Sequence, residues 1–463
     1  MRGPDEAART CRGLLIFDNE VYLGILSTKA RMKNSAVRLT RLLALSSLGG
    51  ALEFFDFVIF LFLAPVISKT FFPPDTPEWL ADVQALGIFA AGYVFRPLGG
   101  LVMAHFGDRS GRKRVFLFSI LLMAFATAGI AFIPSYATAG WIAPLILVLL
   151  RISQGVAIGG EAPGAWTFVA EHVAPRHLAL ACAFMSSSLI AGVLMASLVT
   201  LATHSTFSPE AMLDYGWRVP FIVAGGLGVL GAILRRWLSE TPVFLRAREE
   251  RALTKSLPVA VVLRSHWEAL SISVVATWIL SAVVIVTTLM TPLILQKQYQ
   301  FAPQAALAIS AFGSPFVCVG GLFAGYLADR IGLGRYFLFA SLPFAAATFL
   351  FYSYVSLANG NVYLLYGLAS FFNGMVGVIP CFMVRAFPSS VRFTGISLAY
   401  NVTFAVIGGL TPVMVGALLP TAPLLPMHYL IVVALGMFLL GAYVCLRPQA
   451  IRYRAARDEG LSI

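Results

Sequence analysis

Residues 107–114 read GDRSGRKR, and a similar stretch, ADRIGLGR, stands at residues 328–335. Each follows a long apolar run and carries Asp-Arg, then a glycine, then a further arginine. Glycine permits a tight turn, while an aspartate can accept hydrogen bonds at the start of a helix. The same charged turn therefore occurs twice, which indicates an internal duplication.

A second pair of motifs supports this duplication. Residues 171–176 read EHVAPR and residues 385–392 read RAFPSSVR, and each again follows an apolar run. Both pairs of motifs recur after six predicted helices. Parallel repeats with a binding site between them at mid-membrane are typical of one large class of secondary transporters.

Composition indicates that the apolar runs are membrane spans. The 463 residues are 59% hydrophobic and only 12% charged, whereas soluble domains contain about 45–50% apolar and about 25% charged residues. These values exclude an ordinary soluble enzyme. A spanning helix needs about 20 apolar residues. We predict an all-α polytopic membrane protein with twelve transmembrane helices: 40–67, 83–104, 115–134, 141–163, 179–203, 219–238, 268–295, 304–328, 336–356, 361–384, 394–418 and 428–446.

The duplication and the loops define the parts of the chain. The N-terminal residues are polar and mixed in charge, without the layout of a signal peptide. Met32 stands just before the basic residues that lead into the first span, and we expect it to be the true start, with 1–31 outside the native protein. The predicted parts are a cytoplasmic segment (1–39), a first six-helix half (40–238), a cytoplasmic central loop (239–267), a second, pseudo-symmetric half (268–446) and a cytoplasmic tail (447–463).

The basic residues between the spans fall almost entirely on one side. Twenty lysines and arginines lie in alternate loops and the tail, and only Lys69, Arg218 and Lys297 lie in the other loops. By the positive-inside rule, the crowded side is cytoplasmic and both termini lie inside the cell. Topology thus accounts for the net charge of +12, and we expect no nucleic-acid partner.

Four charged residues stand near the middle of predicted spans, where a charge is costly and usually functional. Glu53 and Asp56 are three residues apart and share a helix face. Two neighbouring carboxylates in a low-dielectric cavity do not both ionise easily, so we assign this pair to proton coupling. Arg96 and Arg151 match a carboxylate with paired hydrogen bonds, and we assign them to the substrate. A permanent lattice of ion pairs among the four is the structural alternative.

The second half has no charged residue in the middle of a span. Its polar and aromatic side chains are expected to give the substrate site its shape and hydrogen bonds. Two asparagines in its apolar helices can bond each other or a backbone carbonyl. With Gln154 of the fourth span, the remaining candidate substrate-binding residues are Trp278, Asn373, Tyr400 and Asn401.

The charged turns are expected to latch the cytoplasmic face. Their aspartates can cap a helix start and pair with arginines of the neighbouring hairpin. Such a cluster would hold that face shut and release it when the halves rock. The candidate residues of this cytoplasmic gate are Asp108, Arg109, Arg112, Glu161, Glu171, Asp329 and Arg330.

The ordered series of motifs resembles the major facilitator superfamily and, within it, the metabolite:proton symporter family of bacterial inner membranes. The resemblance implies a fold of two six-helix halves, and uptake of small organic acids or zwitterions driven by the proton gradient. The motifs that carry it are GALEFFDF (50–57), RPLGG (96–100), the charged turn at 107–114, RISQGVAIGGE (151–161), GWRVPF (216–221), ETPVF (240–244) and FPSSVRFTGISLAYN (387–401).

Two departures from the family pattern bear on function. Arg385 stands where the family usually has a glutamate, so a carboxylate expected to pair with Arg330 or Arg335 is missing and the second latch is expected to be rearranged. The osmosensing proline/betaine members carry a long C-terminal coiled coil, which the short tail at 447–463 does not resemble.

We therefore predict a proton-coupled secondary transporter that imports a small organic carboxylate, such as citrate or 2-oxoglutarate, by alternating access. A zwitterion symporter for betaine or proline is the alternative, because Glu53 and Asp56 suit a cationic group. An efflux antiporter is disfavoured, since residues 179–203 lack the Gly-Pro-x-x-Gly-Gly run of such carriers. No enzyme, cofactor or metal fingerprint occurs, so we expect no enzyme activity, no cofactor and no metal. We also expect the chain to be a monomer in the lipid membrane.

Overall fold

The computed structural model describes residues 47–110, 112–235, 258–355, 361–388 and 391–451, and all structural statements refer to these residues. They are helical apart from short turns, and no strand occurs among them. The predictions for residues 1–39, and for much of the central loop and the tail, lie outside this part of the chain.

The helices match the predicted spans in order. Nine continuous helices of the described chain are long and apolar enough to cross a membrane. Two further spans are helix pairs bent by 59° and 45°, and the third predicted span is the shorter apolar helix Leu117–Ala131. The described residues are therefore consistent with twelve spans.

The two halves contain corresponding sets of helices. The main elements of the first half are Ser47–Phe62, α2 (Ala64–Phe71), α3 (Glu78–Val94), α4 (Arg96–Ser110), α5 (Arg112–Ala131), α6 (Tyr136–Ala139), α7 (Ile142–Ile158), α8 (Glu161–His172), α9 (Leu178–Thr206), α10 (Pro209–Ala211) and α11 (Arg218–Arg235). Those of the second half, with the preceding α13, are α13 (Pro258–Ser265), α14 (Trp267–Val283), η3 (Val284–Leu289), α15 (Thr291–Tyr299), α16 (Pro303–Ile331), α17 (Leu333–Tyr354), α18 (Val362–Asn373), η5 (Gly374–Val378), α19 (Ile379–Ala386), α20 (Arg392–Thr403), η6 (Phe404–Gly408), α21 (Gly409–Leu418) and α22 (Leu425–Leu446).

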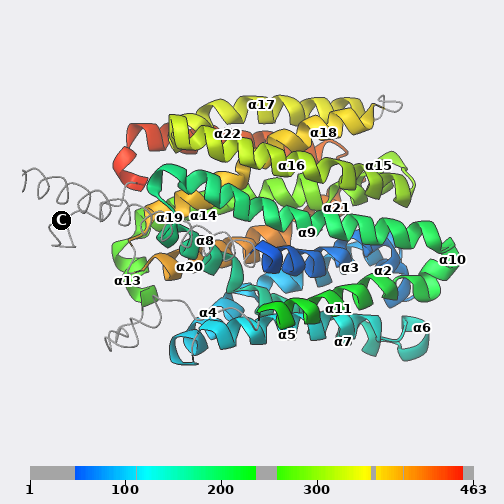
Figure 1. Ribbon diagram of the computed structural model, residues 1–463. Coiled ribbons are helices and arrows are strands. Elements are labelled where there is room, and N and C mark those ends of the chain that lie inside the picture. Colours follow the sequence, from blue (N-terminus) through cyan, green and yellow to red (C-terminus); the bar gives the residue numbers. More distant parts are fainter. Residues whose placement is uncertain (1–46, 111, 236–257, 356–360, 389–390, 452–463) are drawn as a thin grey trace, which may run out of the picture. The chain divides into compact units, whose positions relative to one another are not determined.

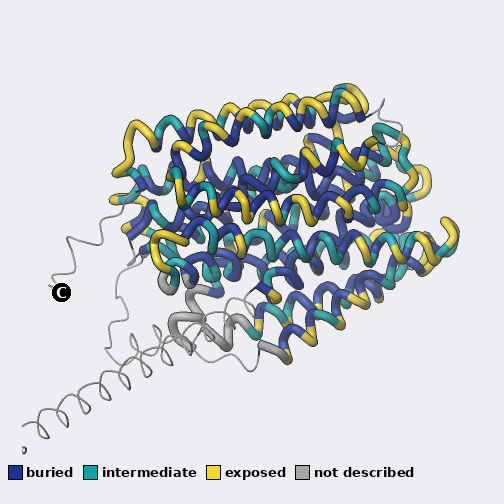
Figure 2. The backbone as a smooth tube through the Cα atoms, turned by 45° about the horizontal axis from the view of Figure 1, so that its top comes forward, coloured by how far each residue is buried: buried dark blue, intermediate teal, exposed yellow. Residues whose placement is uncertain are grey.

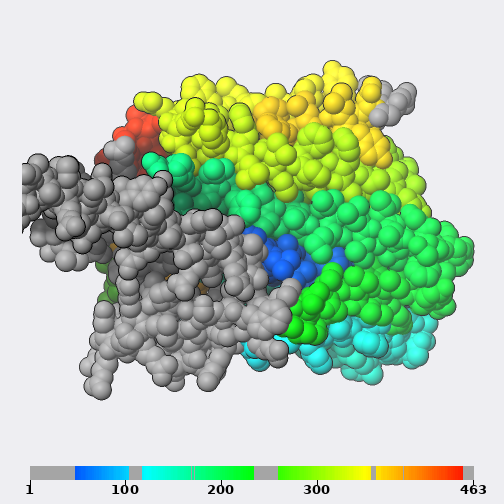
Figure 3. Space-filling model, viewed as in Figure 1, coloured from blue at the N-terminus to red at the C-terminus, as the bar shows by residue number. Residues whose placement is uncertain are grey.

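Each half packs as a bundle. In the first half α5 contacts α7 and α11, and in the second α17 contacts α18 and α22. Helices α5, α7 and α11 lie along one side and α17 and α22 along the opposite side (Figure 1). The halves meet where α9 packs on α16, α3 on α21 and α4 on α20. In the space-filling view α9 and α16 adjoin along their length (Figure 3).

The helix ends gather at two opposite ends of the bundle. The short helix α10 and the helix α15 lie at one of them, and α13 and α19 lie at the other (Figure 1). We call these the α15 end and the α13 end. The loops that the sequence predicts to be cytoplasmic belong to the α13 end.

The outward faces of the helices are apolar. Phe125, Phe132 and Leu364 are each more than 70% exposed, and exposed positions follow the outer faces of the helices while the inner faces are buried (Figure 2). A contiguous apolar surface of this kind would make a soluble protein aggregate. A lipid bilayer covers it without cost, so the burial pattern agrees with a membrane protein.

Glycines bring helix backbones into contact at matching places in the two halves. A Cβ atom on Gly155 of α7 would overlap the backbone of Gly92 in α3. A Cβ atom on Gly320 of α16 would likewise overlap the backbone of Phe371 in α18. Small residues allow this close approach in membrane bundles. Both halves therefore pack their second and fourth spans closely at a glycine, on the fourth span in the first half and on the second span in the second half.

Three helices of the second half are irregular near the middle of the bundle. η3 and η6 are π-helical and η5 is a 3₁₀ segment. Each segment contains a residue that is followed, four positions later, by a proline: Pro292 for η3, Pro380 for η5 and Pro412 for η6. A proline removes the hydrogen bond to the carbonyl four residues earlier and clashes with it, which explains why the regular helix is interrupted there. The interruptions position side chains of the central site.

Candidate functional site

A small cavity lies between the two halves at the centre of the bundle. Phe54 and Trp166 of the first half and Asn373, Tyr400 and Phe404 of the second line it. Its volume is about 40 Å³, whereas small-molecule sites usually measure about 300–1,000 Å³. This cavity by itself therefore has room for water but not for a substrate.

Arg96, at the start of α4, is buried beside this cavity. Its guanidinium carbon lies 5.5 Å from the ring centroid of Tyr93, 5.1 Å from that of Tyr400 and 4.8 Å from that of Phe404. None of its three guanidinium nitrogens makes a well-formed hydrogen bond to a described residue, although the guanidinium and the Tyr400 hydroxyl lie close enough to interact. Because Tyr400 and Phe404 also line the cavity, Arg96 lies directly behind the cavity wall. A buried cation without acceptors can accommodate an anionic ligand.

Arg151 lies in an aromatic pocket that belongs entirely to the first half. Its guanidinium carbon lies 4.3 Å from the ring of Phe57, 4.5 Å from Phe60 and 4.9 Å from Phe89. Its Nη1 atom donates to Gln154 Oε1 at 2.7 Å, whereas Nε and Nη2 have no partner in the described chain. The structure therefore brings Arg151 and Gln154 together but keeps both outside the lining of the central cavity.

Gln154 serves as a link within the first half. Its Nε2 atom donates to Thr127 Oγ1 at 2.7 Å while its carbonyl accepts from Arg151. Both polar ends of the amide are thus engaged inside the protein. We interpret Gln154 as a residue that positions Arg151, in place of the direct substrate contact predicted from the sequence.

Glu53 and Asp56 are buried on the same helix but have different neighbours. Glu53 is close enough to interact electrostatically with Tyr400 of the second half. Asp56 faces α11, where its Oδ2 atom is 3.4 Å from the position that a Cβ atom on Gly228 would take. No described group donates a hydrogen bond to its Oδ1 atom. One carboxyl group therefore adjoins the interface of the halves, and the other lies within the first half.

The asparagines hold the central helices in place. Asn373 Nδ2 donates to Thr288 Oγ1 at 2.6 Å, and Asn401 Nδ2 donates to the carbonyl of Gly159 at 2.6 Å. The sequence left open whether the asparagines bond each other or a backbone carbonyl. Asn401 bonds a backbone carbonyl, whereas Asn373 bonds a threonine hydroxyl, which the sequence analysis did not expect. The amide oxygens of both residues lack a partner among the described groups, and Asn373 lines the cavity.

Trp278 is not placed at the site, contrary to the sequence-based expectation. Its indole Nε1 donates to the hydroxyl of Tyr429 at 3.2 Å, and its ring packs on Gly436 of α22. It therefore fills the contact between α14 and α22 and does not line the cavity. An aromatic residue in an apolar helix can face either way, and here it faces within the second half.

The aromatic residues Phe54, Trp166, Tyr400 and Phe404 form one wall of the cavity, which we call the aromatic wall. Sequence analysis missed several aromatic residues at this site. Trp166 is 2% exposed and meets Tyr400 edge to face at a centroid distance of 5.0 Å. Tyr93 precedes Arg96 by three residues and Phe404 follows Tyr400 by four, so each shares a helix face with a predicted residue. That spacing was the available signal for Tyr93 and Phe404. Trp166 offered no comparable signal, because its contact depends on the other half.

At the α13 end, Asp329 caps a helix of the opposite half. Its two carboxylate oxygens accept the backbone N–H groups of Ala179 and Leu180, both at 2.9 Å. These groups belong to the first turn of α9, whose N–H donors have no partner within the helix. A carboxylate there also benefits from the helix dipole. The aspartate of the repeated motif thus ties the second half to the first.

The rest of this latch is rearranged around two arginines. Arg330 packs over the ring of Tyr326 at 4.4 Å and Arg385 donates to the carbonyl of Pro175 at 3.0 Å. Arg385, which replaces the expected glutamate, therefore bonds to the opposite half through a backbone oxygen. Glu161 is buried at the start of α8. The side chains of Asp108, Arg109, Arg112 and Glu171 lie outside what the structure describes.

Two repeated helical bundles with buried ionisable groups in the interior of their helices define a class of protein. The arrangement is that of a secondary transporter, in which the halves rock around a central site. The comparison with protein families agrees with this class. The model of the Major Facilitator Superfamily matches residues 46–412, and the chain belongs to that superfamily.

Relatives of similar length support the assignment. The chain is 31% identical to the proline/betaine transporter of Salmonella typhimurium, over 86% of this chain and 81% of that protein. It is 33% identical to the inner membrane metabolite transport protein YhjE of Escherichia coli, over 78% and 84%. It is 30% identical to the glycine betaine/proline/ectoine/pipecolic acid transporter OusA of Dickeya dadantii, over 88% and 83%.

A solved structure shares the fold. The proton:xylose symporter XylE superposes with a TM-score of 0.72 at 15% identity, covering 88% of this chain and 94% of that one. The predicted superfamily and the all-α membrane fold are therefore confirmed. The chain is a multi-pass membrane transporter and not an enzyme.

Proposed function

We propose that the chain is a proton-coupled symporter that imports a small zwitterion of the betaine or proline class. This is the alternative left open by the sequence, and the names of two of the relatives favour it over the organic carboxylate. The observation that carries the proposal is the buried guanidinium of Arg96, which lies among aromatic rings beside the central cavity and makes no well-formed hydrogen bond to a described residue. In this proposal Arg96 binds the anionic end of the substrate and the aromatic wall binds the cationic end.

Arg96 receives the carboxylate in this proposal. A guanidinium forms two parallel hydrogen bonds with a carboxylate, and such charge-assisted bonds are the strong ones. The ring of Tyr400 lines the cavity, and its centroid lies 5.1 Å from the guanidinium carbon of Arg96, which does not itself line the cavity. Opening of the halves moves α20 away from α4, and we expect this movement to give a carboxylate access to Arg96.

The aromatic wall receives the cationic end. Quaternary ammonium groups bind to the faces of tryptophan, tyrosine and phenylalanine rings. Phe54, Trp166 and Phe404 line one cavity from both halves. Glu53 lies close to the same wall through Tyr400 and adds a negative charge. A dipolar solute would thus contact an arginine at one end and aromatic rings with a carboxylate at the other.

Asp56 is our candidate for the proton-carrying group. An ionised carboxylate buried without a partner is costly, and no described group bonds to Asp56 Oδ1. We therefore expect it to be protonated in this structure. Proton and solute then stabilise each other's bound state, because reciprocity of binding is required by linkage.

A small organic carboxylate is the second candidate substrate. Arg151 is a second buried guanidinium with partnerless nitrogens in the described chain, and two arginines suit a substrate with two carboxylates. Arg151 lies in the first half, away from the cavity lining, so this candidate requires a larger rearrangement than the zwitterion.

The orientation is part of the proposal. We infer that the α13 end faces the cytoplasm and the α15 end the outside, since the basic loops belong to the α13 end. Uptake then carries solute from the α15 end to the α13 end.

Uptake by the purified protein in proteoliposomes tests the function. With the lumen made alkaline, labelled glycine betaine or proline should accumulate, and a protonophore should stop the accumulation. Citrate and 2-oxoglutarate serve as the competing substrates in parallel vesicles. Accumulation of these acids without uptake of either zwitterion would overturn the proposal in favour of the second candidate.

A further inference from the structure

A second and larger cavity lies at the α15 end. Its volume is about 690 Å³, and its lining comes from both halves. Glu78, Asp82 and Lys69 contribute from the first half, and Met290 and Lys297 from the second. None of the residues that line it also lines the central cavity. The transport chemistry proposed above makes no use of its charges.

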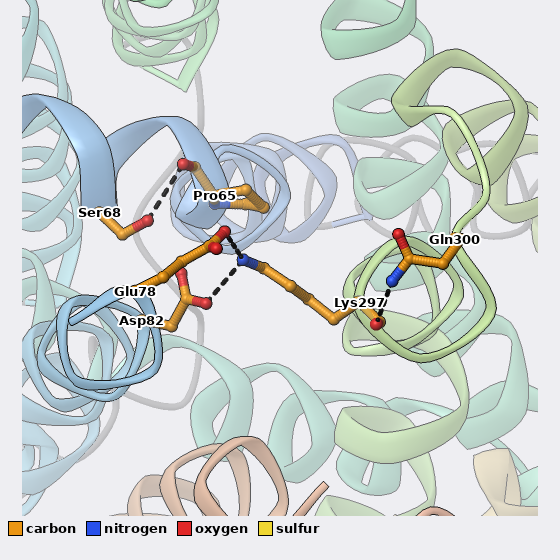
Figure 4. Close-up of polar contacts among 6 residues, drawn as sticks. All are labelled: Pro65, Ser68, Glu78, Asp82, Lys297 and Gln300. Atoms are coloured by element: carbon orange, nitrogen blue, oxygen red, sulfur yellow. Dashed lines mark hydrogen bonds and ion pairs between the residues drawn. The ribbon is translucent and has the colours of Figure 1, made fainter. Parts of the chain in front are cut away.

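One lysine crosses this cavity from one half to the other. Lys297 Nζ of α15 lies 2.8 Å from Glu78 Oε1 and 2.7 Å from Asp82 Oδ2, both on α3. Figure 4 shows the lysine side chain extended between the two helices with the carboxylates converging on its ammonium group. Glu78 and Lys297 are 219 residues apart in the chain. The contact thus exists only while the halves are together at this end.

Local structure keeps these three charges in position. Asp82 follows Glu78 by four residues, so both carboxylates lie on one face at the start of α3. Lys297 lies in the last turn of α15, where its carbonyl accepts from Gln300 Nε2 at 2.9 Å. Acidic groups near a helix N-terminus and a basic group near a C-terminus are each favoured by the helix dipole.

Lys297 keeps its charge at neutral pH. Burial lowers the pKa of its ammonium group, but the hydrogen bonds to Asp82 and Glu78 outweigh burial and raise the pKa above its ordinary value. The side chains are 28%, 65% and 21% exposed for Lys297, Glu78 and Asp82. Partial burial makes this cluster less easily screened by salt than a fully exposed pair.

We propose that Lys297, Glu78 and Asp82 form the outer gate of the transporter, an ionic contact that holds the two halves together at the α15 end. The gate lies opposite the Asp329 contact at the α13 end. Opening to the outside requires both bonds of Lys297 to break. Because two carboxylates share one lysine, loss of either one leaves the gate partly held, and loss of both releases it.

Thiol labelling from the outside tests the gate without use of a transported solute. Met290 is fully buried and lines the cavity, so Met290→Cys, in a chain whose native cysteines are replaced by serine, reports opening. The label is a membrane-impermeant maleimide applied to right-side-out vesicles. Lys297→Met should speed labelling about two- to fivefold, which corresponds to the usual strength of partly exposed ion pairs.

Single and double variants of the two carboxylates weaken the gate in steps, and Lys69 provides a matched control. Glu78→Gln and Asp82→Asn should each speed labelling less than the double variant, which should equal Lys297→Met. Lys69→Met removes a lysine from the same cavity wall, but Lys69 and Glu78 belong to the same half, so labelling should stay unchanged.

A charge exchange guards against misfolding. Lys297→Asp should label fast, and Lys297→Asp combined with Asp82→Lys should return toward the original slow rate. Equal labelling in Lys297→Met and the parent would overturn the gate, as would faster labelling in Lys69→Met or no recovery in the charge exchange. Because no substrate is involved, a wrong assignment of the solute leaves this test intact.

Discussion

At the scale of single residues, the central site depends on charges that meet no partner inside the protein. Arg96 lies among three aromatic rings, and none of its nitrogens makes a well-formed hydrogen bond to an acceptor in the described chain. Such a group is costly in an empty closed site and valuable when a ligand supplies the missing acceptor. The same asymmetry makes Arg96 the residue whose substitution should affect binding most.

Arg96→Lys should raise the apparent KM for glycine betaine about tenfold or more, because a lysine keeps the charge but loses the paired hydrogen bonds. The measurement is initial uptake in proteoliposomes. Gln154→Ala serves as a comparison outside the cavity lining and should change KM less. An unchanged KM in Arg96→Lys would contradict the assignment of the carboxylate.

Replacing Trp166 by leucine should weaken the binding of a substrate with a cationic end about two- to thirtyfold, the usual range for a cation on an aromatic face. Trp278→Leu is the matched control, since Trp278 packs between α14 and α22. Binding is measured as the shift of thermal unfolding with increasing glycine betaine. Equal loss in both variants would argue for general damage to packing.

Asp56→Asn should abolish gradient-driven accumulation and spare exchange of solute across the vesicle membrane. Asparagine has the shape of the protonated carboxyl group, so the buried site against Gly228 stays intact. Accumulation and counterflow are measured side by side with imposed pH gradients. Full accumulation in this variant would remove Asp56 from proton coupling and leave Glu53 as the candidate.

At the scale of helices, glycine contacts and interrupted helices shape the interior. The π-helical segments η3 and η6 and the 3₁₀ segment η5 follow from the prolines that come after them. Phe404 begins η6, Gly374 begins η5, and both line the central cavity. Regular helices would rotate these residues to other faces.

Gly155→Ala should destabilise the protein by about 1–3 kcal/mol, the usual cost of overpacking. An added methyl group would overlap the backbone of Gly92. Gly87→Ala is the matched control, because no atom lies within 4 Å of the added group, and alanine is the better helix former. The midpoint of thermal unfolding in detergent should fall only for Gly155→Ala.

At the scale of the whole molecule, polar contacts join the halves at three levels. Lys297 bonds to α3 at the α15 end, Asn401 to Gly159 near the centre, and Asp329 to α9 at the α13 end. Each contact has to break when the two halves separate at that position along the bundle. Rocking of rigid halves therefore exchanges one set of these contacts for another, as alternating access requires.

Two native cysteines allow the α13 end to be locked. The thiols of Cys182 of α9 and Cys381 of α19 lie close enough to interact across the halves, and both residues are fully buried. Mild oxidation should cross-link them and stop transport, and a reducing agent should restore it. The Cys182→Ser variant should keep its transport under the same oxidation. Inhibition of that variant to the same extent would show that the lock is not responsible.

The sequence predicted the spans, the order of the helices and the duplication, because these depend on apolar length and on motifs that are contiguous in the chain. It also identified Arg96, Asn373, Tyr400 and Asn401, which the structure brings to the interface or the cavity. It did not separate Glu53 from Asp56, although their neighbours differ. A helix that is apolar on all sides carries little information about which face points inward.

The tertiary structure alone decided which distant residues meet. Trp166 contacts Tyr400, Asp329 caps α9, and Lys297 reaches two carboxylates on α3. Each of these contacts joins the two halves, so no local motif identifies both partners, even though the motif at residues 328–335 indicates that Asp329 can cap a helix. In a membrane the local sequence determines where the chain crosses, because transfer to lipid depends on apolar length. The choice of partners depends on how the finished helices pack against one another.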